Sequence, residues 1–221
     1  MSREEIRKFV LRAAHDLLGP LRTIRVNCEL LATADEAKKQ SIQQIKNGVS
    51  RMEVLIRDVA EYCQTVAKEP SMDTTDLNGV LNDARGGLRE ELRRCKAVIT
   101  NDPLPAVRAD AETLGIALRN LIVNACRFRG YGDPRIHVGV RAVDSEWVFS
   151  VRDNGRGFDP SYRELIFEPF ERLDVEEHQG SGLGLTHARK IVQQHGGRIW
   201  AESSIGEGST FWFTLPAPSV S

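Results

Sequence analysis

Two glycine-rich stretches and one upstream histidine carry the residue types that could do chemistry in this chain. The stretches are residues 153–157 (DNGRG) and 180–185 (GSGLGL), and the histidine is His15. Glycines let a backbone approach a ligand closely, and the amides at the start of a helix suit phosphate. An exposed neutral imidazole is a good nucleophile near pH 7. Together these features indicate a nucleotide pocket and a phosphoryl acceptor in one polypeptide.

Asp153 ends an expected strand and enters the first glycine turn. Its carboxylate could accept a hydrogen bond from an exocyclic amine, such as that of adenine. Gly155 and Gly157 permit positive φ and a close approach of backbone to ligand. A plain hairpin turn is the alternative interpretation, because DNG is also a common turn sequence.

Gly180, Gly182 and Gly184 lie just before an expected helix. The backbone amides of such a loop, with a helix N-terminus behind them, suit a phosphate group. The GxGxG spacing matches neither the dinucleotide-binding fingerprint nor the P-loop, so this motif is a weak indication by itself.

Asn120 and Asn124 lie one turn apart on one face of an expected helix, and Arg127 follows about one turn later. The amide oxygens could ligate a hard cation such as Mg2+, which would bridge phosphates, while the guanidinium could meet phosphate charge. A helix cap or a structural hydrogen bond is the alternative role for two asparagines in an otherwise apolar helix.

His15 lies on the polar face of an expected N-terminal helix, and Asp16 beside it could orient the ring or accept its proton. Gly19 leaves the imidazole uncrowded, and Pro20 should bend the helix just past it. Glycine followed by proline costs about 3 kcal/mol or more inside a helix, so we expect a reason for keeping both. The alternative is a solvated surface histidine on a helix that breaks at Gly19-Pro20.

Two amphipathic helices joined by residues 33–40 form an expected antiparallel hairpin, with Asp35 as a candidate N-cap. Much of each apolar stripe stays wet in a lone hairpin, so we expect a homodimer containing a four-helix bundle. Packing of the hairpin on its own C-terminal domain is the competing view. The stripes are Ile6, Val10, Ala13, Leu17, Leu21, Ile24, Cys28 and Leu31, and Ile42, Ile45, Val49, Met52, Ile56, Val59, Cys63 and Val66.

A polar linker at residues 68–75 separates the hairpin from a C-terminal segment with mixed periodicity. Helices mixed with antiparallel strands predict a two-layer α+β sandwich. The expected domains are therefore a helical hairpin, residues 1–68, and an α/β sandwich, residues 74–221. The predicted helices are 76–94, 110–129 and 184–195, and the predicted strands are 97–100, 136–143, 147–151, 198–202 and 210–215.

Composition limits the function classes. The 221 residues have a net charge of −1, with 41% hydrophobic and 28% charged residues, which is ordinary for a soluble globular protein. This balance gives no bulk attraction to nucleic acid, and no apolar run suits a membrane span or a signal peptide. Four widely spaced cysteines argue against a zinc or disulfide framework, and we expect them to be buried in a reducing cytoplasm.

The order of the motifs resembles that of the sensor histidine kinases of two-component systems. Residues 15–22 (HDLLGPLR) are similar to the H box of that family, residues 120–125 (NLIVNA) to its N box, and residues 153–157 to its G1 box. Residues 167–172 (FEPFER) resemble the F box, and residues 180–185 resemble the G2 box. All five occur in family order and span nearly the whole chain.

The resemblance implies a phosphoryl relay. ATP would phosphorylate His15, with Asp16 as its acid/base partner, and the group would pass to an aspartate of a response regulator. A catalytic domain that swings on residues 68–75 could bring the γ-phosphate to His15. The resemblance also implies a homodimer, an upstream sensor domain or sensor protein, and a cytoplasmic location, with the receiver domain docking near His15.

The resemblance also implies the residues of an ATP and Mg2+ site. Asn124 would bind Mg2+ with Asn120 beside it, Arg127 would meet phosphate charge, and Asp153 would hold the adenine amine. A mobile ATP lid would lie around residues 173–180. The remaining nucleotide-binding positions are Gly155 and Gly157, which shape the pocket, and Gly180, Gly182, Leu183 and Gly184 on the phosphate side.

Two departures from the family pattern matter. Gly19 stands where many members carry threonine or asparagine that supports dephosphorylation of the regulator, so phosphatase activity is in doubt. Only fourteen residues precede His15, where a signal-receiving domain is usual. We therefore expect the core of a longer protein, and a stand-alone kinase that takes its signal from a partner is the alternative.

Two rival functions have specific counter-indications. A non-catalytic phosphotransfer scaffold would have lost the nucleotide boxes, whereas this chain keeps Asn124, Asp153 and the second glycine stretch. A topoisomerase, mismatch-repair or chaperone ATPase would lack the H-box hairpin and would need a catalytic carboxylate where this chain has Asn120. A serine kinase of the anti-sigma type would also lack the hairpin.

Overall fold

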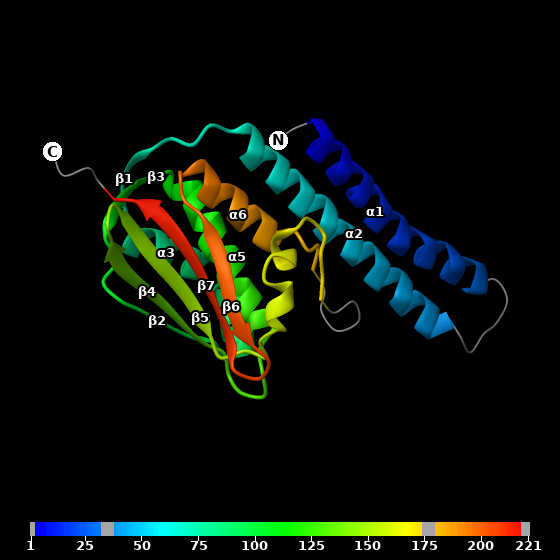
Figure 1. Cartoon of the computed structure of the whole chain (residues 1–221). Helices are drawn as coiled ribbons and strands as arrows, with labels where there is room; N and C mark the ends of the chain where they lie inside the picture. Colours follow the sequence, from blue (N-terminus) through cyan, green and yellow to red (C-terminus); the bar gives the residue numbers. More distant parts are fainter. Residues whose placement is uncertain (1–2, 32–37, 174–179, 218–221) are drawn as a thin grey trace. The chain divides into compact units, whose positions relative to one another are not determined.

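The computed structural model describes residues 3–31, 38–173 and 180–217 (Figure 1). The chain divides into two compact units. The hairpin unit comprises Met1–Gln64 with Pro169–Leu183, and the sheet unit comprises Thr65–Glu168 with Gly184–Ser221. The expected order of a helical hairpin followed by an α/β domain is confirmed.

Two long helices form the hairpin, α1 (Arg3–Leu31) and α2 (Lys38–Ala67). Helix α1 continues through Gly19 and Pro20, so the alternative in which it breaks there is wrong. A Cβ atom added to Gly48 would lie 3.0 Å from Ile24 Cγ1 and 3.4 Å from the carbonyl oxygen of Pro20. Glycine therefore lets the two helices approach closely at this point. The candidate N-cap Asp35 lies outside the described residues.

Two neighbouring rows of α2, each with a spacing of seven residues, differ in burial. The buried row contains a serine and a glycine and is Ser41, Gly48, Leu55 and Tyr62. The exposed row is apolar and is Ile42, Val49, Ile56 and Cys63. Half of the residues in the predicted apolar stripe of α2 are therefore exposed to solvent. The interior of the hairpin instead includes small residues that were not part of the predicted stripe.

The sheet unit contains a five-stranded mixed sheet with the order β2-β4-β5-β7-β6. Its antiparallel pairs agree with the prediction, but β2 pairs parallel with β4. A separate two-stranded sheet pairs β1 with β3. The strands are β1 (Asp73–Asp76), β2 (Val98–Asn101), β3 (Ala106–Ala109), β4 (Arg135–Val143), β5 (Glu146–Asp153), β6 (Ile199–Ser204) and β7 (Gly208–Pro216).

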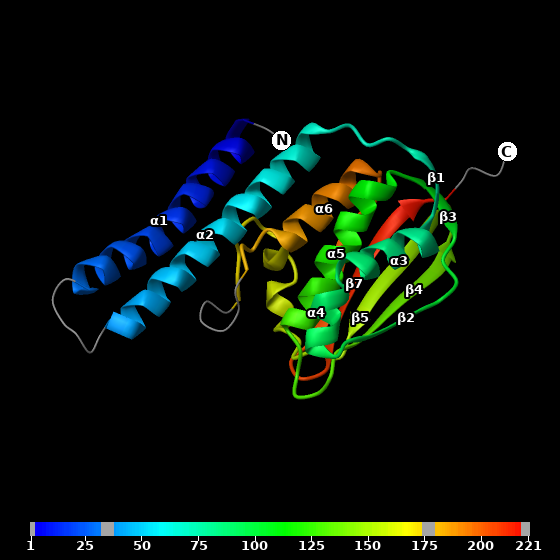
Figure 2. The same ribbon diagram turned by 180° about the vertical axis from the view of Figure 1, so that it is seen from behind.

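Helices cover one face of the five-stranded sheet, as Figure 2 shows from behind. Residues 76–94, predicted as one helix, form two helices because the chain turns at Leu88, where φ is −103° and ψ is 9°. The core between the layers includes Leu114, Phe149 and Phe211, each at most 1% exposed. The helices are α3 (Leu77–Gly87), α4 (Arg89–Cys95), α5 (Ala111–Arg127) and α6 (Gly184–Gln194), with 3-10 turns η1 (Pro160–Tyr162) and η2 (Leu165–Phe167).

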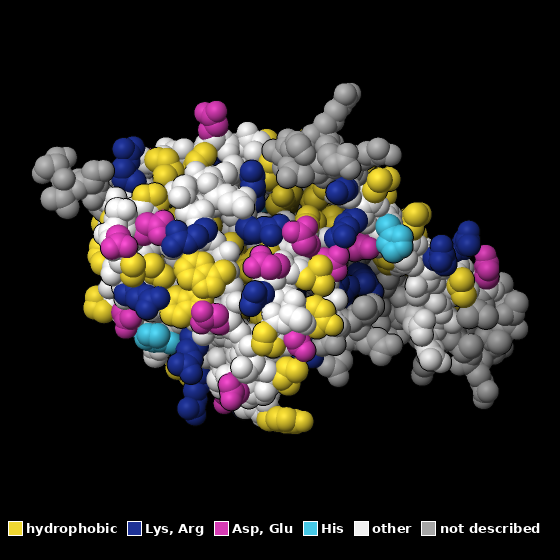
Figure 3. Space-filling model, viewed as in Figure 1, with side chains coloured by type: hydrophobic (Ala, Val, Ile, Leu, Met, Phe, Trp, Pro, Cys, Tyr) yellow, Lys and Arg dark blue, Asp and Glu magenta, His cyan; other side chains and the backbone are white. Residues whose placement is uncertain are grey.

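The opposite face of the sheet carries aromatic and charged side chains. Trp200 and Trp212 stack with ring centroids 6.2 Å apart, and the guanidiniums of Arg198 and Arg141 lie over these rings. Figure 3 shows charges of both signs interspersed with apolar side chains. On the face seen in this view, charges of both signs are therefore mixed.

Three further expectations can be compared with the structure. Cys95 and Cys126 are buried as expected, but Cys28 and Cys63 are exposed, and all four are free thiols. None of the described helices is long and apolar enough to cross a membrane. The described residues also contain no group of three or more His, Cys, Asp or Glu side chains arranged to hold a metal.

Candidate nucleotide and phosphoacceptor sites

Asp153, the last residue of β5, is a buried carboxylate in which one of the two oxygens is already hydrogen-bonded to the protein. Its Oδ1 accepts hydrogen bonds from the backbone amides of Gly155 at 2.7 Å and Ser209 at 3.2 Å. Among the described residues no hydrogen bond reaches Oδ2. Burial raises the pKa of the Asp153 carboxyl, and the two amides only partly offset this effect. The side chain can therefore offer one buried acceptor to a ligand.

The glycines after Asp153 are required by close backbone approaches. A Cβ atom at Gly155 would lie 2.5 Å from the carbonyl oxygen of Phe128, and one at Gly157, where φ is +65°, would lie 2.0 Å from that of Ser204. Sequence reasoning missed Gly208, whose φ of +91° places its backbone against Asp153. The sequence feature that could have identified Gly208 is its position in a glycine-rich loop at the start of β7.

The first glycine stretch is not a hairpin turn. It leads from β5 into η1, and the next strand of the sheet begins only at Ile199. Asn154, also missed by sequence reasoning, anchors the stretch by accepting from the Arg135 amide at 2.7 Å and donating to the Asp133 carbonyl at 3.2 Å. The alternative of a plain β-hairpin turn is therefore wrong.

Helix α5 carries Asn120, Asn124 and Arg127 in its C-terminal half. The Nδ2 atom of Asn120 is buried and has no hydrogen-bond partner among the described residues. A Cβ atom on Gly184, the first residue of α6, would lie 3.4 Å from Asn120 Oδ1, so these two predicted site residues are neighbours. Asn124 and Arg127 are half-buried. A buried amide without a partner is costly unless something binds it.

Gly180, Gly182 and Leu183 belong to the hairpin unit. Gly182 has φ of +75°, its carbonyl accepts from the Phe170 amide at 3.1 Å, and an added Cβ would lie 2.7 Å from the carbonyl carbon of Phe170. Gly180 is half-buried, and Leu183 is 1% exposed. The turn at Gly182 thus brings the second glycine stretch against the end of the F-box-like segment. Residues 174–179 of the expected lid lie outside the described residues.

The His15 side chain is 88% exposed, and its Nδ1 atom lies 3.2 Å from Asp16 Oδ1. A carboxylate can only accept, so Nδ1 is the donor of this bond, and Nε2 has no hydrogen-bond partner among the described residues. One turn earlier, Arg12 donates to Glu171 Oε1 and to the Pro169 carbonyl, each at 2.8 Å. Arg12 is therefore bonded within the hairpin unit.

Both parts of the chain match known families. Residues 5–64 match the His Kinase A (phospho-acceptor) domain, and residues 109–219 match the histidine kinase-, DNA gyrase B- and HSP90-like ATPases. This chain belongs to the sensor histidine kinases. The combination excludes both the scaffold without an ATPase domain and the gyrase-type ATPases without a phosphoacceptor hairpin.

Relatives span a wide range of sources. Cyanobacterial phytochrome A of Nostoc sp. is 40% identical, and the alignment covers 97% of this chain and 29% of the phytochrome. The methanogenesis regulatory histidine kinase FilI of Methanothrix harundinacea is 34% identical, with 97% and 25% covered. The chain thus spans less than a third of these curated relatives.

A solved structure gives the same fold. The crystal structure of histidine kinase ThkA in complex with response regulator protein TrrA matches with a TM-score of 0.72 and 25% identity. That match covers 96% of this chain and 61% of the other. It includes both the hairpin and the α/β domain.

Proposed function

We propose that this chain is the transmitter core of a sensor histidine kinase that autophosphorylates His15 and passes the phosphoryl group to an aspartate of a response regulator. Residues 1–68 would serve as the dimerisation and phosphoacceptor hairpin, and residues 74–221 as the ATP-binding domain. The observation that carries the proposal is the exposed His15 ring with Nδ1 held by Asp16, in a chain whose C-terminal part belongs to an ATPase family.

The chemistry assigned to His15 follows from its hydrogen bond. Asp16 accepts from Nδ1–H and stabilises the positive charge that develops on the ring, so Nε2 is the nucleophile. Nε2 forms a bond to the γ-phosphorus of ATP while the bond from that phosphorus to the β,γ-bridging oxygen breaks, and ADP leaves. Asp16 is then placed to accept the Nδ1 proton.

The buried carboxylate of Asp153 supports its assignment to adenine. Its Oδ2 atom would accept a hydrogen bond from the exocyclic amine, and Gly155 and Gly157 would shape the pocket floor. A hydrogen bond to an ionised acceptor contributes roughly 1.5–3 kcal/mol when buried. The rigid turn keeps that acceptor in place before the nucleotide arrives.

The asparagines of α5 fit a phosphate-bound cation. Asn124 would ligate Mg2+ through its amide oxygen, with Asn120 beside it and Arg127 close to phosphate charge. The buried Nδ2 of Asn120 has no hydrogen-bond partner among the described residues and is a donor, so it supports a phosphate oxygen beside the cation, which could accept from it. Mg2+ bound there would neutralise phosphate charge. The phosphate side would be lined by Gly180, Gly182, Leu183 and Gly184.

The proposed partners follow from the hairpin. A second copy would cover the apolar row of Ile42, Val49 and Ile56, which are 42–54% exposed, and complete a four-helix bundle. ThkA is solved with a response regulator, and we infer that a receiver domain docks here near His15. An upstream sensor domain or protein and a cytoplasmic location complete the proposal.

Incubation with γ-labelled ATP and Mg2+ tests the function. Wild type should acquire acid-labile, base-stable label, His15→Gln should acquire none while still binding ATP, and Asp153→Asn should lose ATP binding. Label that persists on His15→Gln would overturn the assignment of the acceptor. ATP binding by Asp153→Asn at wild-type affinity would overturn the assignment of the adenine contact.

A further inference from the structure

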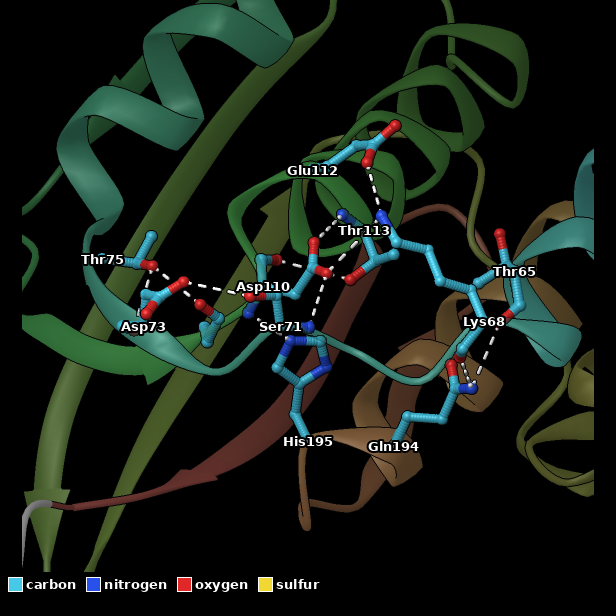
Figure 4. A network of polar contacts seen from close by, with 11 residues as sticks. Thr65, Lys68, Ser71, Asp73, Thr75, Asp110, Glu112, Thr113, Gln194 and His195 are labelled. Atoms are coloured by element: carbon cyan, nitrogen blue, oxygen red, sulfur yellow. Dashed lines mark hydrogen bonds and ion pairs between the residues drawn. The ribbon is translucent and has the colours of Figure 1, made fainter.

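The segment between α2 and β1 was expected to be a swinging linker, but it is bonded to the sheet unit. The Ser71 amide donates to Asp110 Oδ2 at 2.9 Å. Lys68 Nζ lies 2.7 Å from Glu112 Oε2 and 3.8 Å from Asp110 Oδ2. Figure 4 shows these contacts converging on the start of α5. Residues 73–75 then pair with β3 as part of β1.

The last residues of α2 belong to the sheet unit and are bonded to α6. Gln194 Nε2 donates to the carbonyl oxygens of Thr65 at 3.2 Å and Lys68 at 3.3 Å. The carbonyls at a helix C-terminus lack partners within the helix, so the amide of Gln194 acts as a cap supplied by α6. Thr65 Oγ1 lies 2.8 Å from Nε2 of the buried His187.

Asp110 joins this segment to the helix that carries Asn120 and Asn124. Its side chain is 4% exposed, and its Oδ1 accepts from the Thr113 amide at 3.0 Å, which caps α5. The Asp110 amide donates to Nε2 of buried His195 at 3.0 Å. Burial opposes ionisation of Asp110, but the amides of Thr113 and Ser71 and the Lys68 charge outweigh it and lower its pKa. A single carboxylate therefore holds two separate backbone segments through charge-assisted bonds.

We propose that residues 68–72 form a strap that fixes the end of α2 to the start of α5, with Asp110 and Gln194 as positioning residues for phosphoryl transfer. This inference rests on the proposed function. Residues 68–72 then cannot act as a free hinge, because they are bonded to other residues of the unit to which they belong. A displacement of the end of α2 is carried to α5 through the strap.

The strap matters because transfer depends on position. A free linker lets the acceptor and the nucleotide sample many separations, which lowers the effective concentration of one at the other. A misplacement of about 1 Å can cost about 100-fold in rate. The hydrogen bonds and ion pairs of residues 68–72 restrict the conformations of this segment, and none of these contacts involves the nucleotide.

Three full-length variants separate the strap from the stability of α5. Asp110→Ser keeps a good N-cap for α5 but loses the bond to Ser71. Gln194→Glu removes both donors at nearly constant volume. Gln193→Glu makes the same change at an exposed neighbour on α6 and serves as the matched control.

Hydrogen exchange at the Ser71 amide tests the strap directly. In wild type this amide should exchange about 10-fold or more slowly than in Asp110→Ser, because its acceptor is removed only in the variant. Gln193→Glu should match wild type. Exchange of the wild-type Ser71 amide at the rate of an unstructured peptide would overturn the strap, whether or not the protein is a kinase.

Autophosphorylation kinetics test the positioning role. We expect kcat to fall about 10-fold in Asp110→Ser and Gln194→Glu, with KM for ATP within about two-fold of wild type. A merely structural role would raise KM, since α5 carries Asn120 and Asn124. Unchanged kcat in both variants would overturn the positioning role. Wild type without phosphohistidine would instead overturn the proposed function, and the exchange result would still decide the strap.

Discussion

The hairpin unit and the sheet unit bury their apolar residues to different degrees. In the hairpin, Val10 is 56% exposed and Ile56 is 54% exposed. In the sheet unit, Leu114, Phe149 and Phe211 are at most 1% exposed. The sheet unit therefore completes its own core, whereas the hairpin presents apolar surface that a globular unit normally hides.

The residues inside the hairpin also differ from those in the core of the sheet unit. The buried positions of the hairpin include the small or polar residues Asn27, Ser41 and Gly48 as well as the apolar Phe9 and Leu55. Small and polar residues bring the helices close together but contribute little burial of apolar area. In the proposed homodimer a second hairpin would cover the exposed apolar surface of the first, whereas the core of the sheet unit is already buried within one chain. Four predictions test this difference.

The largest expected effect is on association. Val49→Glu combined with Ile56→Glu places two charges per chain in the exposed apolar row, and these charges would be desolvated in a dimer. We expect the dissociation constant of the dimer to rise about 1,000-fold, which corresponds to a loss of about 4 kcal/mol in the free energy of association. Sedimentation equilibrium at several concentrations measures this constant.

The matched control carries the same added charge on the other side of α2. Asn47 and Ser50 are exposed, and their helical positions point away from the apolar row. Asn47→Glu combined with Ser50→Glu should leave the association constant within about three-fold of wild type. Equal weakening by both pairs would mean that net charge, and not the apolar row, controls the assembly.

The next effect is confined to the sheet unit. Gly157→Ala forces a side chain onto φ of +65° and places Cβ 2.0 Å from the Ser204 carbonyl oxygen. We expect a loss of about 3 kcal/mol in the free energy of unfolding. Urea unfolding followed by tryptophan fluorescence reports this unit, because Trp147, Trp200 and Trp212 all lie in it.

Gly86→Ala provides the comparison, since an added Cβ at this exposed position of α3 meets nothing within 4 Å. It should stabilise the unit by about 0.5–1 kcal/mol, because alanine favours helix over glycine. If the two alanine variants unfold at the same urea concentration, the backbone at Gly157 can move far enough from Ser204 to accommodate a Cβ atom.

The third effect depends on pH. His187 is 4% exposed, and burial, followed by the Arg119 charge, lowers its pKa to about 4. The unfolded chain takes up this proton near pH 6.5, but the folded unit does so only near pH 4, so stability falls as pH drops between these values. From pH 7 to 5 the loss should be about 2 kcal/mol.

His187→Gln removes the titrating group while leaving a side chain that can reach Thr65. The quantity to measure is the difference in unfolding free energy between wild type and variant at pH 7 and at pH 5, because other groups cancel in it. A difference that does not change with pH would show that His187 is already protonated in the folded unit at pH 5.

Sequence reasoning found most of the sheet unit because its strong signals are local. Alternation predicted β4 and β5, and helical periodicity predicted α5 and α6. It missed β1 and β3, whose four residues each (DTTD and AVRA) carry too short a pattern, and whose pairing joins residues 30 to 36 apart in sequence. The expected linker was mistaken in part for the same reason, because residues 73–75 belong to β1 and the acceptor for the Ser71 amide lies 39 residues away.

The candidate site shows a similar limit. Asp153 could be predicted because it directly precedes Gly155 and Gly157, and closely spaced glycines mark a turn. Gly208 lies in a different loop, far from Asp153 in the sequence, so nothing in the sequence linked the two residues. In the hairpin, hydrophobicity selected the row with Val49 and Ile56 but not the row with Gly48. Close approach of two helices depends on small residues, and an apolar pattern does not register them.

The smallest effect is in the hairpin interior. Asn27 is 7% exposed, and its Nδ2 donates to the Thr23 carbonyl at 2.8 Å and to Gln44 Oε1 at 3.2 Å. Asn27→Leu replaces this amide with an apolar side chain, and the exposed Gln44 can bond water instead. We expect a gain of about 1 kcal/mol, measured by thermal melting of the helical circular dichroism at fixed protein concentration.

Asn47→Leu, at an exposed position of the same hairpin, is the control and should give no gain. A loss of stability in Asn27→Leu would mean that the Asn27–Gln44 bond, and not apolar burial, holds the two helices in register. The hairpin and the sheet unit would then differ in kind: one organised by a polar contact between helices, the other by a closed apolar core. A gain would make the difference one of degree, with the hairpin simply carrying too little buried apolar area until a partner covers it.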